Sequence, residues 1–246
     1  MQTYQILIEY DGEKFVGWQK QKNGKSIQGT IQKVLKKILK EKIIIFGSGR
    51  TDSGVHAFEQ SAHFKYKHVI ENETKFLNSV NFFLLKYNIT ILKIKKMNKL
   101  FHARHCAKER MYRYYIINRV TPLSLEKNRA WNIKRKLNID LMVKGSKLLI
   151  GTKDFSTFRA SSCSSKSPIK TLKEVKIKKI KNKIEITFVS RSFLQQQVRS
   201  MVGCLKCLGE GKWDLGKFKK AFMSKKRINC APPAPPHGLY LWKVKY

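Results

Sequence analysis

One carboxylate in this sequence is distinguished by the residues around it. Asp52 follows Arg50 by two positions and lies between Gly49 and Gly54. Apolar residues precede this segment and residues 58–66 alternate as a strand does, which predicts a turn between two strands. Such a turn fixes the direction of an acid, and its glycines let a large ligand approach the backbone closely. Asp52 is therefore a candidate catalytic residue.

The other four aspartates have simpler interpretations. Asp11 starts a turn, and Asp140 and Asp214 stand where helices are expected to begin. Asp154 precedes an aromatic residue in an expected loop and receives no role. Taken alone, Asp52 would be read as an Asx-turn residue. The arginine, the histidine and the two glycines near Asp52 favour a catalytic role instead.

A single carboxylate limits the reactions that can be considered. Glycoside hydrolysis normally requires two carboxyl groups, and no second acid lies near Asp52 in the sequence. No His, Asp or Glu cluster has the spacing of metal ligands, and no GxxxxGK phosphate loop is present. We predict no metal. A lone aspartate suits nucleophilic or general-base catalysis on a substrate whose leaving group stays in the site.

The charge of the chain indicates a polyanionic partner. The 246 residues include 52 Lys and Arg against 16 Asp and Glu, a formal net charge of +36. Such a field attracts nucleic acid through its phosphates. Because 41 of the 52 basic residues are lysines, genome composition with a solvated lysine surface is the alternative. At this charge we favour nucleic acid.

Other features argue against a membrane or secreted protein. No apolar run reaches 18 residues, and the N-terminus is predicted to form a strand rather than a signal peptide. The five cysteines are odd in number and scattered, which is typical of a reduced cytoplasmic protein. Cys204 and Cys207 form a CxxC inside an apolar periodic run, where buried helical thiols are expected rather than a metal or redox site.

The first hundred residues follow the order strand, helix, strand, strand, helix, strand, which is the ferredoxin-like pattern. The later residues give a similar but less regular series of strands and helices. Both halves have enough periodic apolar residues for a core. We predict an α+β fold of two ferredoxin-like or RRM-like domains, residues 1–104 and 105–246. Each has an antiparallel sheet with helices on one face.

The periodicity places each expected element. In the first half these are strands over 3–10, 43–48, 58–66 and 88–96, a helix capped by Ser26, and a helix around 76–84. In the second half they are strands over 107–118, 171–180, 183–191 and 239–246, and helices over 140–150, 193–208 and 214–223.

Several short motifs occur in one order along nearly the whole chain, from about residue 4 to the end. Together they closely resemble the TruA family of tRNA pseudouridine synthases, and GRTDxGVHA is a specific signature. The motifs are Tyr10-Asp11-Gly12, Phe15, Gly17-Trp18-Gln19, residues 49–57, Phe101-His102-Ala103-Arg104, Arg110-x-Tyr112-Arg113-Tyr114, Asp154-Phe155-x-x-Phe158-Arg159, Phe193-Leu194-x-x-Gln197-Val198-Arg199 and residues 236–241.

The resemblance implies isomerisation of uridine to pseudouridine at positions 38, 39 and 40 of the tRNA anticodon arm. It also implies a homodimer that uses no cofactor and whose catalytic cleft lies between the two domains. Asp52 matches the family's catalytic aspartate, and Tyr112 matches the tyrosine that contacts the target base. Arg199 matches the arginine that pairs with the aspartate, and Arg50 the arginine that helps to displace the target nucleotide.

This chemistry agrees with the residues. The uracil is detached from C1′, rotated and reattached through C5, so no water attacks and no second carboxylate is needed. Asp52 would attack C1′ or accept a sugar proton in a glycal-type route, and the sequence leaves both open. Tyr112 offers a ring face for stacking and a phenol for proton transfer. Extrusion of the paired uridine costs a few kcal/mol, which arginine or aromatic insertion can offset.

The alternative is a non-catalytic RNA-binding or ribosome-associated protein with two RRM-like domains, although no RNP-type pattern has the right spacing. Without the resemblance, Tyr112 would be an ordinary strand aromatic and Arg199 an arginine on a helix surface. Ser53 stands where the family more often has alanine, and we expect its hydroxyl to make a local hydrogen bond in the turn. His56 is expected to be structural, because the reaction needs no imidazole.

Overall fold

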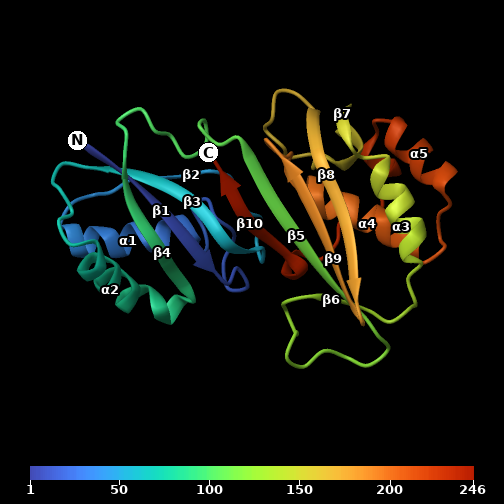
Figure 1. Ribbon diagram of the computed structural model, residues 1–246, viewed down its shortest axis with the longest axis horizontal. Coiled ribbons are helices and arrows are strands. Elements are labelled where there is room, and N and C mark those ends of the chain that lie inside the picture. The colour runs from blue at the N-terminus through green and yellow to red at the C-terminus, as the bar shows by residue number, and fades with distance from the viewer. The chain divides into compact units, whose positions relative to one another are not determined.

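The computed structural model describes residues 1–246 and contains five α-helices, ten strands and four short 3₁₀ helices. The chain divides into two compact units, of which the first is Met1–Lys108 with Leu241–Tyr246 and the second is Glu109–Tyr240 (Figure 1). The end of the chain thus returns to the first unit. The two domains expected from the sequence, 1–104 and 105–246, stay a prediction. The α+β fold class is confirmed.

The sheet of the first unit has the strand order of the ferredoxin-like pattern. β1 lies between β4 and β3 and is antiparallel to both, and β2 and β10 adjoin β3. α1 and α2 pack on each other, and α2 also contacts β4 (Figure 1). The elements are β1 (Gln2–Tyr10), α1 (Ile27–Leu39), β2 (Ile45–Gly47), β3 (His56–Tyr66), α2 (Glu73–Leu84), η1 (Leu85–Tyr87), β4 (Ile89–Met97) and β10 (Leu239–Lys245).

Local signals explain why these segments take these forms. The Ser26 side chain accepts a hydrogen bond from the N–H of Gly29 and caps α1, as the sequence predicted. α1 then buries Ile27, Ile31 and Leu35 on one face, which follows the helical period. In β1 the alternating residues point inward, and Tyr4, Ile6, Ile8 and Tyr10 are all buried.

The sheet of the second unit has the order β6-β5-β9-β8-β7, antiparallel except for the parallel pair β5–β6. α3 packs on β8 and on α4, and α5 contacts both helices (Figure 1). The elements are β5 (Glu109–Asn118), β6 (Trp131–Ile133), α3 (Ile139–Lys147), β7 (Gly151–Asp154), η2 (Ser156–Phe158), β8 (Ile169–Ile180), β9 (Lys183–Ser190), α4 (Gln197–Gly209), α5 (Leu215–Met223), η3 (Arg227–Asn229) and η4 (Pro236–Gly238).

The second unit differs from the sequence prediction in its details. α4 begins at Gln197 rather than 193, because Gln196 has a φ of +60° and the Gln197 side chain accepts the N–H of Leu194. The cap of α3 is Asn138 rather than Asp140, whereas Asp214 caps α5 as expected. The prediction missed β6 and β7, which have three and four residues and are too short to show a period.

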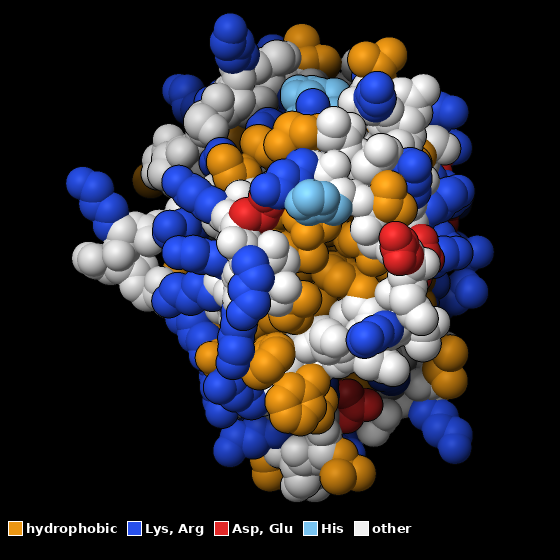
Figure 2. Space-filling view, turned by 90° about the vertical axis from the view of Figure 1, so that its left-hand side faces the viewer, with side chains coloured by type: hydrophobic (Ala, Val, Ile, Leu, Met, Phe, Trp, Pro, Cys, Tyr) orange, Lys and Arg blue, Asp and Glu red, His pale blue; other side chains and the backbone are white.

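The surface carries its charge unevenly. Figure 2 shows Lys and Arg side chains along both margins of the face in view, with hydrophobic side chains exposed between them and few acidic groups. In the first unit the large exposed apolar residues include Ile44, Phe46, Phe82, Leu85 and Leu92. None of the helices combines the length and the apolar character that crossing a bilayer requires.

Candidate active site

The turn between β2 and β3 displays Asp52. The N–H of Val55 donates to the Asp52 carbonyl at 3.2 Å, which closes a four-residue turn. Gly54 occupies the third position with a φ of +74°, a conformation that side-chain-bearing residues rarely adopt. The tight turn expected from the sequence is therefore present. Asp52 is half-buried, and the Arg50 side chain is exposed.

The N-terminal segment packs directly against the back of this turn. The Tyr10 hydroxyl hydrogen bonds the Thr51 hydroxyl at 2.8 Å, and the N–H of Trp18 donates to the Thr51 carbonyl at 3.1 Å. A Cβ on Gly17, whose φ is +106°, would lie 2.7 Å from the same carbonyl oxygen. A Cβ on Gly12 would lie 2.0 Å from the Val55 carbonyl oxygen. These contacts fix the backbone on both sides of Asp52.

Hydrogen bonds hold the strand end before the turn. The Ser48 hydroxyl donates to the Gln60 side-chain oxygen at 2.7 Å, and the Gln60 amide donates to the Gly49 carbonyl at 2.9 Å. Gln60 is fully buried, so water does not compete with either bond. The stem of the turn is rigid for this reason.

The prediction for Ser53 was wrong. Its hydroxyl donates to the carbonyl of Phe15 at 3.0 Å, a residue 38 positions away, rather than to a neighbour in the turn. The reason is that the N-terminal segment, and not the turn itself, covers this side of the backbone. Ser53 thereby adds one more tie between the two segments.

His56 is structural in its contacts. Its ring is 2 % exposed. Its Nδ1 lies 3.1 Å from the N–H nitrogen of Gly12 and 3.1 Å from an Asp11 carboxylate oxygen. One nitrogen cannot accept and donate at once, so the proton on Nδ1 selects between the two bonds. Either bond ties the Asp11-Gly12 turn to β3 behind the Asp52 turn.

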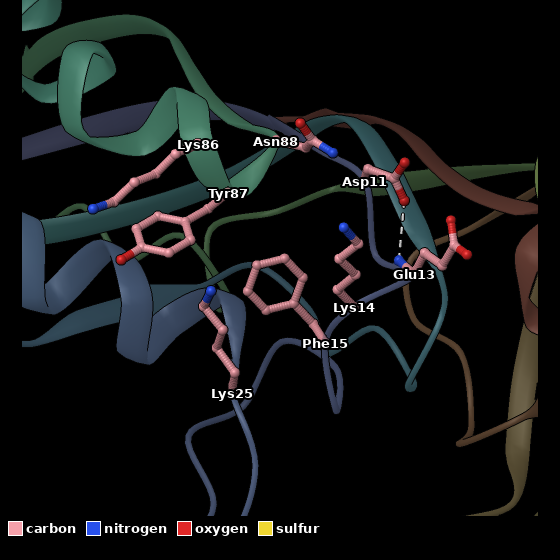
Figure 3. Close-up of a pocket in the computed structure, with 8 residues that line it drawn as sticks. All are labelled: Asp11, Glu13, Lys14, Phe15, Lys25, Lys86, Tyr87 and Asn88. Carbon is pink, nitrogen blue, oxygen red and sulfur yellow. Dashed lines mark hydrogen bonds between the residues drawn. The ribbon is translucent and has the colours of Figure 1, made fainter.

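A pocket of the first unit lies along the same N-terminal segment, but Asp52 does not line it. The Lys25 ammonium stands 3.7 Å from the centroid of the Tyr87 ring, and Lys86 stands 5.2 Å from it. Figure 3 shows the charged side chains around the Phe15 and Tyr87 rings. The pocket is lined by Asp11, Glu13, Lys14, Phe15, Lys25, Lys86, Tyr87 and Asn88. Its cations face aromatic rings and two carboxylates.

Tyr112 belongs to the second unit and lies on β5. It is 7 % exposed, stands opposite Phe188 in the pairing of β5 with β9, and meets the Phe193 ring edge-to-face at 5.1 Å. These neighbours set the plane of the ring. A ring held this way needs no reorganisation before it contacts a ligand.

Arg199 lies in the first turn of α4. Its Nε donates to the Ala234 carbonyl at 2.7 Å, and the Ala234 N–H donates to the Arg199 carbonyl at 2.9 Å. The Tyr114 hydroxyl donates to the neighbouring Pro235 carbonyl at 2.9 Å. Burial raises the pKa of Tyr114 well above its usual value, and the positive charge of Arg199 opposes this rise. The segment 234–235 thus positions Arg199 beside Tyr114.

Sequence reasoning gave no role to Arg110. This arginine is 7 % exposed and donates through Nη1 to the Arg191 carbonyl. It precedes Tyr112 by two residues on β5, so both side chains lie on one face of the strand. That spacing of two in the motif Arg110-x-Tyr112 was the signal that could have identified it. Buried arginines are rare unless they have a defined electrostatic role.

The predicted site residues therefore fall into two sets. Arg50 and Asp52 share one turn of the first unit, and Tyr112 and Arg199 belong to the second unit. No group of three or more His, Cys, Asp or Glu side chains is placed to hold a metal ion. The arrangement offers a fixed carboxylate, an oriented phenol and several guanidinium groups.

Comparison with known proteins identifies the class of enzyme. A family profile described as tRNA pseudouridine synthase matches residues 6–105 and 146–246, and the chain belongs to this family. The chain is 62 % identical over 246 residues to the tRNA pseudouridine synthase A of Pelagibacter ubique, with all of both chains covered. Proteins of the same name from Parvibaculum lavamentivorans and Ehrlichia ruminantium are 42 % and 41 % identical, with 100 % and 99 % of each chain covered.

Membership in this family makes the chain an isomerase that forms pseudouridine in tRNA. It also decides against the alternative of a non-catalytic RNA-binding or ribosome-associated protein. The resemblance noted in the sequence is confirmed over the full chain.

Proposed function

We propose that the protein converts uridine to pseudouridine at positions 38, 39 and 40 of the anticodon stem-loop of tRNA, with Asp52 as the essential carboxylate. The observation that carries this proposal is the Asp52 turn. Gly12 and Gly17 pack against its backbone, and Tyr10 hydrogen bonds the hydroxyl of Thr51 within it. The turn therefore holds the acid in one direction. The contacts predict a low reorganisation cost for attack at the sugar.

The reaction accounts for the single carboxylate. Asp52 acts at the target nucleoside, either by forming a bond to C1′ or by accepting a sugar proton. The C1′–N1 bond breaks, the uracil turns, and C5 bonds to C1′, which releases Asp52 from C1′ or is accompanied by return of the sugar proton. The proton on C5 is then lost, and N1 gains a proton. Atoms are conserved within the nucleoside, and no oxidant or reductant takes part. The proposal therefore includes no cofactor.

The other site residues act on the substrate or on Asp52. Arg199 pairs with Asp52 and keeps it ionised. Its position supports this role, because an arginine in the first helical turn faces the positive end of the helix dipole and is stabilised by a carboxylate. Tyr112 contacts the target base, and Arg50 helps to displace the nucleotide. The proposal also includes a homodimer acting in the cytoplasm.

The decisive experiment measures tritium release from tRNA labelled at C5 of uridine. Asp52→Asn preserves size and removes the charge, so we expect turnover to fall at least 10³-fold while tRNA binding changes less than about threefold. Asp214→Asn is the matched control, because asparagine caps a helix as well as aspartate. Substantial release by Asp52→Asn would exclude Asp52 as the essential acid.

The positions are tested separately. A tRNA transcript with cytidine at 38, 39 and 40 should release no tritium, whereas restoring uridine at one of them should restore release at that position. Release from the cytidine transcript would contradict the positions without contradicting the enzyme class. Sedimentation equilibrium of the intact protein tests the homodimer.

A further inference from the structure

A second hollow, in the second unit, is lined almost entirely by cations. It encloses about 330 Å³ and is bordered by one arginine, four lysines, two asparagines and a valine. We call it the cationic hollow. Its residues are Asn118, Arg119, Val120, Lys134, Lys136, Lys179, Lys181 and Asn182. They come from the end of β5, the segment after β6 and the tip of the β8–β9 hairpin.

Asn118 fixes the frame of the hollow. Its backbone N–H donates to the Asn182 carbonyl at 2.7 Å. Its side-chain amide donates to the carbonyls of Ile133 and Arg135 at 2.8 and 2.7 Å, and its side-chain oxygen accepts the N–H of Leu137 at 3.0 Å. One residue therefore ties together the three segments that carry the arginine and the lysines. Neutral backbone bonds, rather than ion pairs, bring these like charges close.

The charge of the hollow is not balanced within it. None of the eight lining residues is acidic, and none of the four lysines forms an ion pair. The pocket in Figure 3 is different, because two carboxylates and two aromatic rings face its lysines. Arg119 is held by bonds from Nε and Nη2 to the carbonyls of Thr121 and Pro122, so its charge is also kept in place.

Five converging cations repel one another unless an anion lies among them. Exposed lysine ammonium groups bind phosphate as point charges, and an arginine adds directed donors. We propose that the cationic hollow binds backbone phosphates of the substrate tRNA and so adds to the affinity for the RNA. The proposal rests on tRNA as the substrate and not on the role of Asp52.

The test replaces three of the lysines in the complete protein. In the variant Lys134→Gln/Lys136→Gln/Lys179→Gln we expect the dissociation constant of tRNA to rise at least tenfold at 0.1 M KCl, measured by fluorescence anisotropy. The slope of log Kd against log salt should become shallower by about 2, because each lost phosphate contact removes about 0.7 to 0.9.

The matched control removes the same charge from elsewhere in the second unit. Lys219→Gln/Lys220→Gln/Lys226→Gln alters three exposed lysines outside the hollow, and we expect a Kd change below threefold and an unaltered slope. Equal effects of the two triple variants would overturn the proposal in favour of a diffuse field. A site for free phosphate would also overturn the proposal. In that case inorganic phosphate would raise the melting temperature of the wild type, and the triple variant of the cationic hollow would bind tRNA as the wild type does.

Binding is read without turnover, so the outcome is independent of the proposed catalytic residues. Thermal melting of both triple variants shows whether they are folded. Because the variant of the cationic hollow loses charges that repel one another, it should be at least as stable as the wild type.

Discussion

Burial changes the acid–base behaviour of His63, a residue of β3 that sequence analysis did not single out. The ring is 3 % exposed, and its Nδ1 accepts the N–H of Ala103 at 3.1 Å. Desolvation lowers the pKa of His63, the neighbouring His102 adds to this effect, and together they bring it to about 4. The neutral imidazole is thus part of the native hydrogen-bond network, since a proton on Nδ1 would displace the Ala103 bond.

This predicts acid sensitivity in a defined window. The unfolded chain binds a proton on His63 below its ordinary pKa of about 6.5, whereas the folded protein does so only near 4. Stability is therefore complete above pH 6.5 and falls as the pH drops toward 4, by about 2 to 3 kcal/mol from this group. Urea unfolding at pH 7 and at pH 4.5 measures the difference.

Two variants check the assignment to His63. His63→Asn supplies an oxygen near the position of Nδ1 and does not titrate, so the loss of stability between pH 7 and 4.5 should shrink. His68→Asn, at an exposed histidine, should retain the full loss. The same pH dependence in both variants would assign it to other groups.

At the scale of elements, the contact between α4 and the segment 230–235 positions Arg199. The Ala234 backbone pairs with Arg199, and Cys204 meets Cys230 with 3.6 Å between the sulfur atoms. Gly203 lies at the closest approach, where a Cβ would be 2.1 Å from the Pro232 carbonyl oxygen. Glycine is required here because the backbones of α4 and the segment 230–235 lie too close for a Cβ, although glycine has a low helix propensity.

Gly203→Ala should therefore separate the segment from α4. We expect a loss of about 2 to 3 kcal/mol in the free energy of unfolding, typical of overpacking at a rigid contact, together with slower turnover because Ala234 moves from Arg199. Gly216→Ala in α5 is the matched change, since its Cβ would meet only the flexible Asp214 side chain at 3.3 Å. That variant should gain about 0.5 to 1 kcal/mol. Shifts of the urea midpoint in opposite directions from the wild type would establish the contact. Equal midpoints of the two variants would contradict it.

The net charge of +36 acts on the whole molecule in two ways, and salt weakens both. Self-repulsion destabilises the compact protein, and the same field draws in RNA. Figure 2 shows many basic side chains along the margins of the face in view and few acidic ones to offset them. We expect bound tRNA to neutralise part of this charge.

Raising KCl from 0.01 to 0.2 M should increase the melting temperature of the free protein by several degrees. Most of this rise should come at the low end, because the Debye length falls from about 30 to 8 Å over this range. The affinity for tRNA should fall over the same range. A melting temperature independent of salt would show that the charges are spaced too widely to repel, and a neutral osmolyte of equal osmolality provides the control.

Local signals in the sequence were sufficient for most of the elements, although not for the short strands β6 and β7, and for the turn that carries Asp52. Gly49 and Gly54 around Asp52 predict a turn, and Gly54 adopts the positive φ that glycine permits. Ser26 predicts the start of α1 because its oxygen can cap a helix. The order of strands and helices followed from their periods, since each period depends only on residues a few positions apart. The motifs identified the family for the same reason.

Packing between distant segments decided the rest. Gly12 and Gly17 pack against the Asp52 turn, and Ser53 bonds Phe15, so distant parts of the sequence meet at this turn. Arg110 is likewise buried by residues far from it in the sequence. The cationic hollow likewise exists only because Asn118 gathers three segments. No local pattern encodes such contacts, because they depend on which faces meet once the sheets and helices have packed.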